Sequence, residues 1–129
     1  MASELRVNTL KDASGNNSVA TSVVFNGSAK AWVNLDGDGT ISIRDSYNTS
    51  GATDNGTGDY TFSWSSNMSN INYMSTGCAG QNQTALLNVS QPENTTPPAT
   101  GSCRFGVAYQ NSNPFDGGYT GASIHGDLA

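Results

Sequence analysis

The sequence predicts an all-β protein: a single antiparallel β-sandwich or barrel-like domain preceded by an extended N-terminal segment. Strict alternation of apolar and polar residues at 60–64 and 102–110 is typical of strands with one buried face. Turn-forming Asp, Asn and Gly residues separate these runs at short intervals. Charged residues make up only 12% of the chain, and Asn, Ser, Thr and Gly, which are poor helix formers, are abundant, so we expect almost no helix.

The first predicted strands lie at 30–35 and 40–45. In the first, Ala31, Val33 and Leu35 share one face and Trp32 lies on the other. Asp36-Gly37-Asp38-Gly39 separates the two runs and predicts a hairpin turn. Ile41 and Ile43 give the second strand an apolar face, and a polar connection with Asp54-Asn55-Gly56 leads to the strand at 60–64.

Four further strands are predicted after a polar loop in which Met68 points toward the core. They span 71–79, 84–89, 102–110 and 119–128. The connection at 90–101 contains three of the four prolines and is predicted to be exposed and extended. The segment 111–118 is rich in turn residues and is predicted to be a loop with an exposed aromatic, Phe115.

Residues 1–27 differ from the domain at 28–129. The segment is expected to form one extended piece, a turn, and a second extended piece over Val19 to Phe25. Such a short unit cannot bury its apolar side chains by itself. It needs its own domain, another copy of the chain or a larger assembly, and the residues predicted to dock or oligomerise are Leu5, Val7, Leu10, Val23, Val24 and Phe25.

The charge pattern argues against nucleic-acid and anionic-membrane partners. The formal net charge is -5, and the five cationic residues are scattered along the sequence. No apolar run is long enough to span a membrane, and the N-terminus lacks the apolar stretch of a signal peptide. We therefore expect synthesis in the cytoplasm without export.

No residue pattern predicts catalysis, a metal site or a cofactor. Asp36-Gly37-Asp38-Gly39 lacks the remaining ligands of a calcium loop. The only histidine, His125, has no nucleophile motif around it, and Asp127 would share its strand face. Cys78 and Cys103 could form a disulfide if their strands were neighbours, but a buried reduced pair is the expectation for a reducing compartment.

Most aromatic residues, Trp32 included, alternate along strands and are expected in the core. Those in or beside loops are candidates for ligand binding, because exposed rings and short acids suit sugar faces and hydroxyls. The predicted binding residues are Tyr47, Phe115, Asp116 and Tyr119.

An ordered series of motifs resembles a module of tailed-bacteriophage fibre and virion proteins, particularly those of marine phages. The series is Ala31-Trp32-Val33-Asn34-Leu35-Asp36-Gly37, Ile41-Ser42-Ile43-Arg44-Asp45-Ser46-Tyr47-Asn48, Asp54-Asn55-Gly56-Thr57-Gly58-Asp59-Tyr60, Asn72-Tyr73 and Gly126-Asp127. It covers about Gly27 to Leu128. The opening Leu5-Arg6-Val7-Asn8-Thr9-Leu10-Lys11 is also similar to the start of phage fibre proteins.

The resemblance implies a non-enzymatic virion protein. It would be a short tail fibre, a tail knob or a capsid decoration protein, since the chain has no long shaft. The resemblance further implies a homotrimer whose N-terminal segment joins other virion proteins, with host-surface glycan as a possible ligand. The alternative is a carbohydrate-binding module of a cell-bound or secreted protein.

Overall fold

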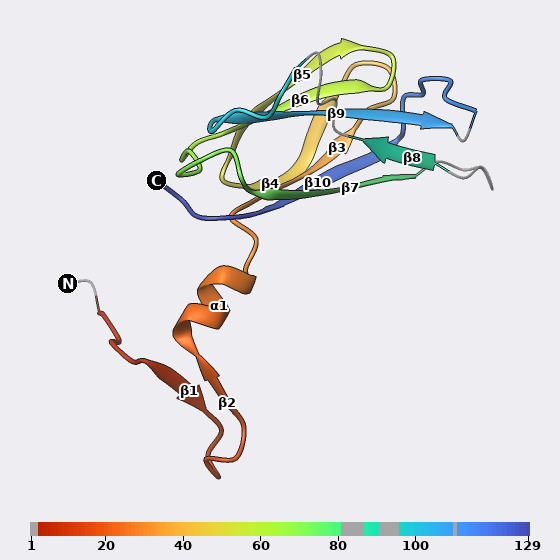
Figure 1. Cartoon of the computed structure of the whole chain (residues 1–129). Helices are drawn as coiled ribbons and strands as arrows, with labels where there is room; N and C mark the ends of the chain where they lie inside the picture. Colours follow the sequence, from red (N-terminus) through yellow and green to blue (C-terminus); the bar gives the residue numbers. More distant parts are fainter. Residues whose placement is uncertain (1–2, 81–86, 91–95, 110) are drawn as a thin grey trace.

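A computed structural model describes residues 3–80, 87–90, 96–109 and 111–129, with the backbone alone considered at 87–90. The protein is all-β with one short helix, as the sequence predicts. Two four-stranded antiparallel sheets face each other as a sandwich, so the barrel alternative is not adopted (Figure 1). A two-stranded hairpin and the helix lie outside this sandwich and form an N-terminal arm, residues 3–28 (Figure 1).

The first sheet has the strand order β4-β3-β10-β7. Its strands are β3 (Ala31–Asp36), β4 (Ser42–Tyr47), β7 (Met74–Gly80) and β10 (Tyr119–His125). The predicted hairpin is confirmed, because β3 pairs antiparallel with β4 across the Asp-Gly turn. The last strand, β10, lies between β3 and β7, so the two ends of the domain meet in this sheet.

The second sheet has the order β5-β6-β9-β8. Its strands are β5 (Thr49–Gly56), β6 (Asp59–Trp64), β8 (Leu87–Ser90) and β9 (Ser102–Tyr109). The prediction of a plain connection between β4 and β6 is wrong, since β5 occupies most of it and pairs with β6. β5 has no apolar alternation because it is an edge strand that β6 pairs on one side only.

The core fills the space between the sheets. β3 and β10 contribute aliphatic residues, and β6 and β9 contribute the large side chains, as their alternation predicts. Met68 closes one end and is 1% exposed, which confirms the prediction that it reaches the core. The buried hydrophobic residues are Ala31, Val33, Leu35, Tyr60, Phe62, Trp64, Met68, Cys103, Phe105, Val107, Ala122 and Ile124.

One residue, Asn48, carries the chain from the first sheet to the second. It lies between β4 and β5 with a positive φ of 51°, a conformation that Asn tolerates better than most residues. Its Nδ2 donates to the carbonyls of Lys30 and Ser66, and its Oδ1 accepts from the Ser66 amide at 2.7 Å. These bonds to both layers fix the corner at which the strand changes sheet.

The N-terminal arm consists of β1 (Thr9–Lys11), β2 (Ser18–Ala20) and α1 (Thr21–Gly27). The expectation that 19–25 is extended is therefore wrong over most of its length. The helix begins at Thr21, and the Thr21 amide donates to the Asn8 carbonyl at 3.0 Å. The Asp12 carboxylate accepts from the Asn16 and Asn17 amides and so closes the turn between the two strands.

Other differences lie at strand ends. β7 begins at Met74 and leaves Ile71 exposed, and β10 ends at His125. Ile43 is 40% exposed because β4 is an edge strand. Residues 84–86 of the strand predicted at 84–89, residues 91–95 of the connection predicted at 90–101, and position 110 lie outside the described residues.

Candidate functional site

The outward surface of the first sheet is the main candidate, and we call it the outer face. Alternation directs Ala31, Val33 and Leu35 inward, so the intervening residues of β3 point outward. The register then places outward residues of β4, β10 and β7 beside them. The outer face comprises Trp32, Asn34, Asp36, Tyr47, Thr76, Cys78, Tyr119, Gly121 and Ser123.

Arg44 contacts Tyr119 at one end of this face. The Arg44 guanidinium lies 4.4 Å from the centre of the Tyr119 ring, within range of a cation–π contact. Its Nη2 lies 2.6 Å from Asp36 Oδ2, and its Nη1 donates to the carbonyls of Leu35 and Gly118. The guanidinium thus fixes the Tyr119 ring, yet that residue remains 62% exposed.

A depression of about 330 Å³ lies next to Tyr119, over the middle of β10. Gly121 forms part of its floor, where a side chain would be only 3.0 Å from Cys78 Sγ. Asn34, Thr76, Cys78 and Ser123 also line it. The depression exists because a glycine without a side chain is surrounded by residues that have one.

Tyr47 lies at the opposite end of the same face. It is paired with Trp32, whereas Tyr119 lies beyond the Thr120–Leu35 pair. Four residues at ~3.3 Å each separate the two tyrosines along the strand direction by about 13 Å. Trp32 is only partly buried and lies outside the core, so the expectation that it packs inside is wrong. The sequence signal for this outward position is the alternation of β3, which puts Trp32 on the face opposite to Ala31 and Val33.

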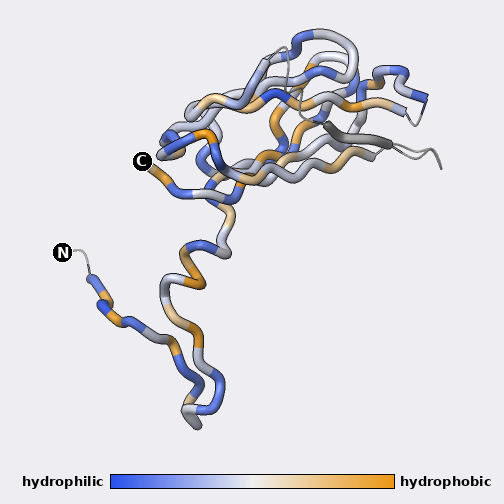
Figure 2. Tube along the Cα trace, in the orientation of Figure 1, coloured by the Kyte–Doolittle hydropathy of each residue, from blue (hydrophilic) through white to orange (hydrophobic). Residues whose placement is uncertain are grey.

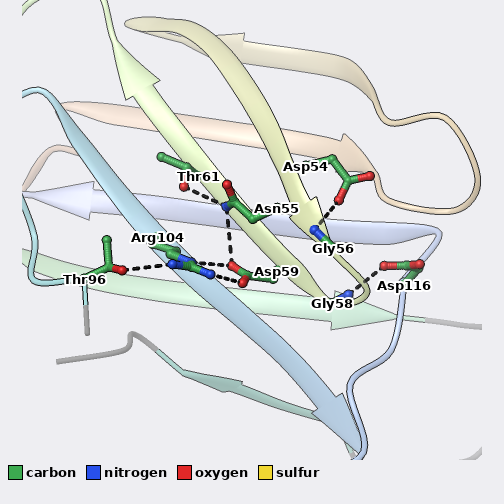
Figure 3. A network of polar contacts seen from close by, with 9 residues as sticks. All are labelled: Asp54, Asn55, Gly56, Gly58, Asp59, Thr61, Thr96, Arg104 and Asp116. Carbon is green, nitrogen blue, oxygen red and sulfur yellow. Dashed lines mark hydrogen bonds and ion pairs between the residues drawn. The ribbon is translucent and has the colours of Figure 1, made fainter. Parts of the chain in front are cut away.

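Phe115 and Asp116 lie near Tyr119 but are engaged in internal contacts. The Phe115 ring is partly buried, 4.8 Å from the Tyr109 ring, so the prediction of an exposed aromatic is wrong. Asp116 Oδ1 accepts from the Gly58 amide at 2.7 Å (Figure 3) and from the Tyr60 hydroxyl at 2.8 Å. Burial, followed by this carboxylate, raises the pKa of Tyr60. The structure therefore places Phe115, Asp116 and Tyr119, three of the four predicted binding residues, at the same end of the domain. The contacts of Phe115 and Asp116 stabilise the loop 111–118 itself.

A second polar cluster holds the turn between β5 and β6. Asp59 pairs with Arg104, which also donates to Thr96, and Asn55 donates to Asp59 and Thr61 (Figure 3). The hydrogen bonds from Arg104 hold the pKa of Asp59 below its ordinary value of 3.8. The charges of Asp59 and Arg104 neutralise each other, which indicates that this cluster positions β6 against β9.

Cysteine and histidine provide no catalytic arrangement in the part of the chain that is described. Both cysteines are free: Cys103 is buried in the second sheet, whereas Cys78 is exposed on the first, so the expectation of a buried pair is half right. Ser123 Oγ lies 3.3 Å from His125 Nε2, but no carboxylate contacts the imidazole among the described residues. Nor do the described His, Cys, Asp and Glu residues include a group of three suited to a metal ion.

The N-terminal arm exposes all the residues that were predicted to dock. Leu5 is 80% exposed, Val23 59% and Phe25 51%. Val7, Leu10 and Val24 are also exposed, and α1 buries no residue. In Figure 2, hydrophobic positions (orange) recur along the arm, which lies apart from the sandwich. Lys30 connects the base of the arm to the start of the sandwich, because its Nζ donates hydrogen bonds to the carbonyls of Phe25 and Ser28.

The comparisons with known proteins add no relative: no family model, no curated protein and no solved structure matches this chain. Within the described residues, no helix has the length and apolar character needed to cross a bilayer.

Proposed function

We propose that this chain is a structural protein of a bacteriophage virion, anchored to the particle by its N-terminal arm. It would serve as a short tail fibre, a tail knob or a capsid decoration protein, without catalytic activity. The motif series in 27–128 gives the virion context by resemblance. The observation that carries the anchoring role is the arm itself, with six exposed apolar side chains on a unit outside the sandwich.

The energetics of the arm favour an attached state. A two-stranded hairpin of three residue pairs is at best marginal alone in water. Burying each of the larger apolar side chains contributes roughly 1.5–3 kcal/mol before the cost of ordering. Attachment to a partner surface therefore stabilises both the complex and the arm. The partners are other virion proteins, and a homotrimer of this chain is the assembly that the resemblance implies.

Deletion of residues 2–25 tests this role. The expected result is loss of incorporation into particles, measured by mass spectrometry of purified virions, with the thermal transition of the sandwich retained. Loss of that transition would instead indicate that the arm folds back onto its own domain as an edge strand. Light scattering of the intact protein tests the trimer, and a monomer mass at micromolar concentration would contradict it.

A matched pair of point variants sharpens the test. Phe25 on the arm and Ile71 on the sandwich are each 51% exposed. Phe25→Ser is expected to reduce incorporation, whereas Ile71→Ser is expected to leave it unchanged. Equal losses for both variants would mean that general surface hydrophobicity, and not the arm, determines attachment.

The alternative function is a carbohydrate-binding module of a cell-bound or secreted protein. The outer face favours it, because the exposed aromatic residue Tyr119 lies beside a depression on this face. The two functions differ in the arm. A carbohydrate-binding module would bind its sugar without residues 2–25 and would be absent from virions.

A further inference from the structure

We infer that the depression beside Tyr119 on the outer face binds one ring of a neutral glycan. The inference rests on the proposed function only for the source of that glycan, which would be the surface of the host cell. The site itself is argued from the chemistry of its lining.

The first argument is the exposed ring of Tyr119. Aromatic rings offer a flat apolar surface with a polar hydroxyl, which suits the C–H face and the hydroxyls of a pyranose. The contact with Arg44 holds this ring in place, so less conformational freedom is lost when a ligand binds. The Tyr119 hydroxyl makes no hydrogen bond to the described residues and is available to a ligand.

The second argument is the mixture of polar groups around the depression. The Asn34 side-chain amide, exposed and without a hydrogen bond to the described part of the chain, can both donate and accept. Thr76 and Ser123 add hydroxyl groups on the neighbouring strands. A ligand with several hydroxyls matches this set, because each of its groups can also donate or accept.

The third argument is charge. Arg44 is the cation at the rim, and its guanidinium is already paired with Asp36 at 2.6 Å. A phosphate or carboxylate ligand would have to compete with that carboxylate for the same donors. A neutral sugar needs no unpaired charge, so it is favoured over an anionic ligand.

The fourth argument is location. Tyr119 lies at the end of β10 remote from the arm. β10 runs from Tyr119 to His125, and Ile124 near its other end pairs with Ala31, where the arm joins. The floor of the depression at Gly121 lies between these ends. A chain anchored by its arm would leave this end of the outer face free to meet a second surface.

Binding is tested with the full-length protein on a glycan array, followed by titration with soluble neutral oligosaccharides of glucose, galactose and N-acetylglucosamine. Tyr119→Ala and Asn34→Ala are each expected to weaken binding roughly tenfold, which corresponds to about 1.4 kcal/mol. The first variant loses the ring contact with the sugar, and the second loses the hydrogen bonds of the amide. Ile71→Ala is the control, because Ile71 is exposed on the sandwich but does not line the depression. That variant is expected to bind normally.

Cys78 provides an independent readout. It is exposed in the lining, whereas Cys103 is buried, so a maleimide is expected to label Cys78 alone. A bound oligosaccharide should slow this labelling, and a bulky label should abolish binding. Cys78→Ser serves only as the unlabelled control in the maleimide reaction.

Three outcomes would overturn the inference. The first is that no neutral sugar binds or protects Cys78. The second is that Tyr119→Ala binds as tightly as the Ile71→Ala control. The third is that Cys78 becomes protected only as protein concentration rises, which would make the face an interface between copies. Incorporation of Tyr119→Ala into particles, measured in parallel, separates this site from the proposed function, because that variant should assemble normally even where sugar binding fails.

Discussion

Replacing Asp116 should reveal that this loop acid is a structural residue. Its Oδ1 accepts hydrogen bonds from the Gly58 amide and the Tyr60 hydroxyl, joining the loop 111–118 to the start of β6. In Asp116→Ala both bonds are lost. The buried Gly58 amide is left without this acceptor, while the Tyr60 hydroxyl can still donate to the Gly37 carbonyl at 3.2 Å.

The magnitude follows from these two contacts. A hydrogen bond to a charged group contributes about 1.5–3 kcal/mol, and the Tyr60 hydroxyl recovers part of its share. Asp116→Ala should therefore cost about 2–3 kcal/mol and lower Tm by roughly 10 °C in a domain of this size. Asp116→Asn should cost less, since its carbonyl oxygen can still accept.

Thermal and urea unfolding followed by circular dichroism measure this effect. Asp127→Ala is the control, because that side chain is exposed and bonds to none of the described residues. A Tm within about 2 °C of the parent for Asp116→Ala would refute the reasoning, since such a shift corresponds to less than ~0.5 kcal/mol. The acid would then be free for a ligand, as the sequence suggested.

Three further predictions concern the sandwich. In urea unfolding, Gly58→Ala should destabilise the sandwich far more than Gly39→Ala. Both glycines have a φ of +64°, but only at Gly58 would the new carbon lie 2.2 Å from a backbone oxygen. Acidification below about pH 4 should remove the stability that Asp59 contributes, since the pKa of Asp59 is lower in the fold than in the unfolded chain. In Asp59→Asn, the free energy of unfolding should depend less on pH in that range. A thiol reagent should modify Cys78 quickly in the native protein and Cys103 only after unfolding, because burial raises the pKa of Cys103 to about 11; mass spectrometry showing both labelled at equal rates would contradict this.

The sequence predicts the sandwich well where one face of a strand is buried. Tyr60, Phe62 and Trp64 alternate with polar residues because β6 packs one side on the core, and their burial confirms the pattern. The turn after β3 is predictable from Asp-Gly alone. β5 was not predictable, because its polar residues 49–56 become a strand through pairing with β6 and not through their own pattern.

The helix and the outer face show two other limits of the sequence. Val23, Val24 and Phe25 favour strands, yet they form part of α1, where no neighbouring strand pairs with them. The alternation of aromatic residues along strands favours the core for Trp32, although its place between Ala31 and Val33 puts it on the opposite face of β3. Arg44 could not be assigned to the candidate site from sequence, since its contacts with Gly118 and Tyr119 join segments far apart in the chain.

The contacts of Arg44 also determine how the candidate site must be tested. Its guanidinium bonds to β3 and to the Gly118 carbonyl, so it joins the strand end to the loop that Asp116 braces. A change at Asp116 can therefore displace Tyr119 without any contact between Asp116 and a ligand. Loss of sugar binding in an Asp116 variant would report a loosened loop, whereas loss in Tyr119→Ala with an unchanged Tm would report the binding surface itself. Measuring Tm beside every binding constant is what separates these two causes.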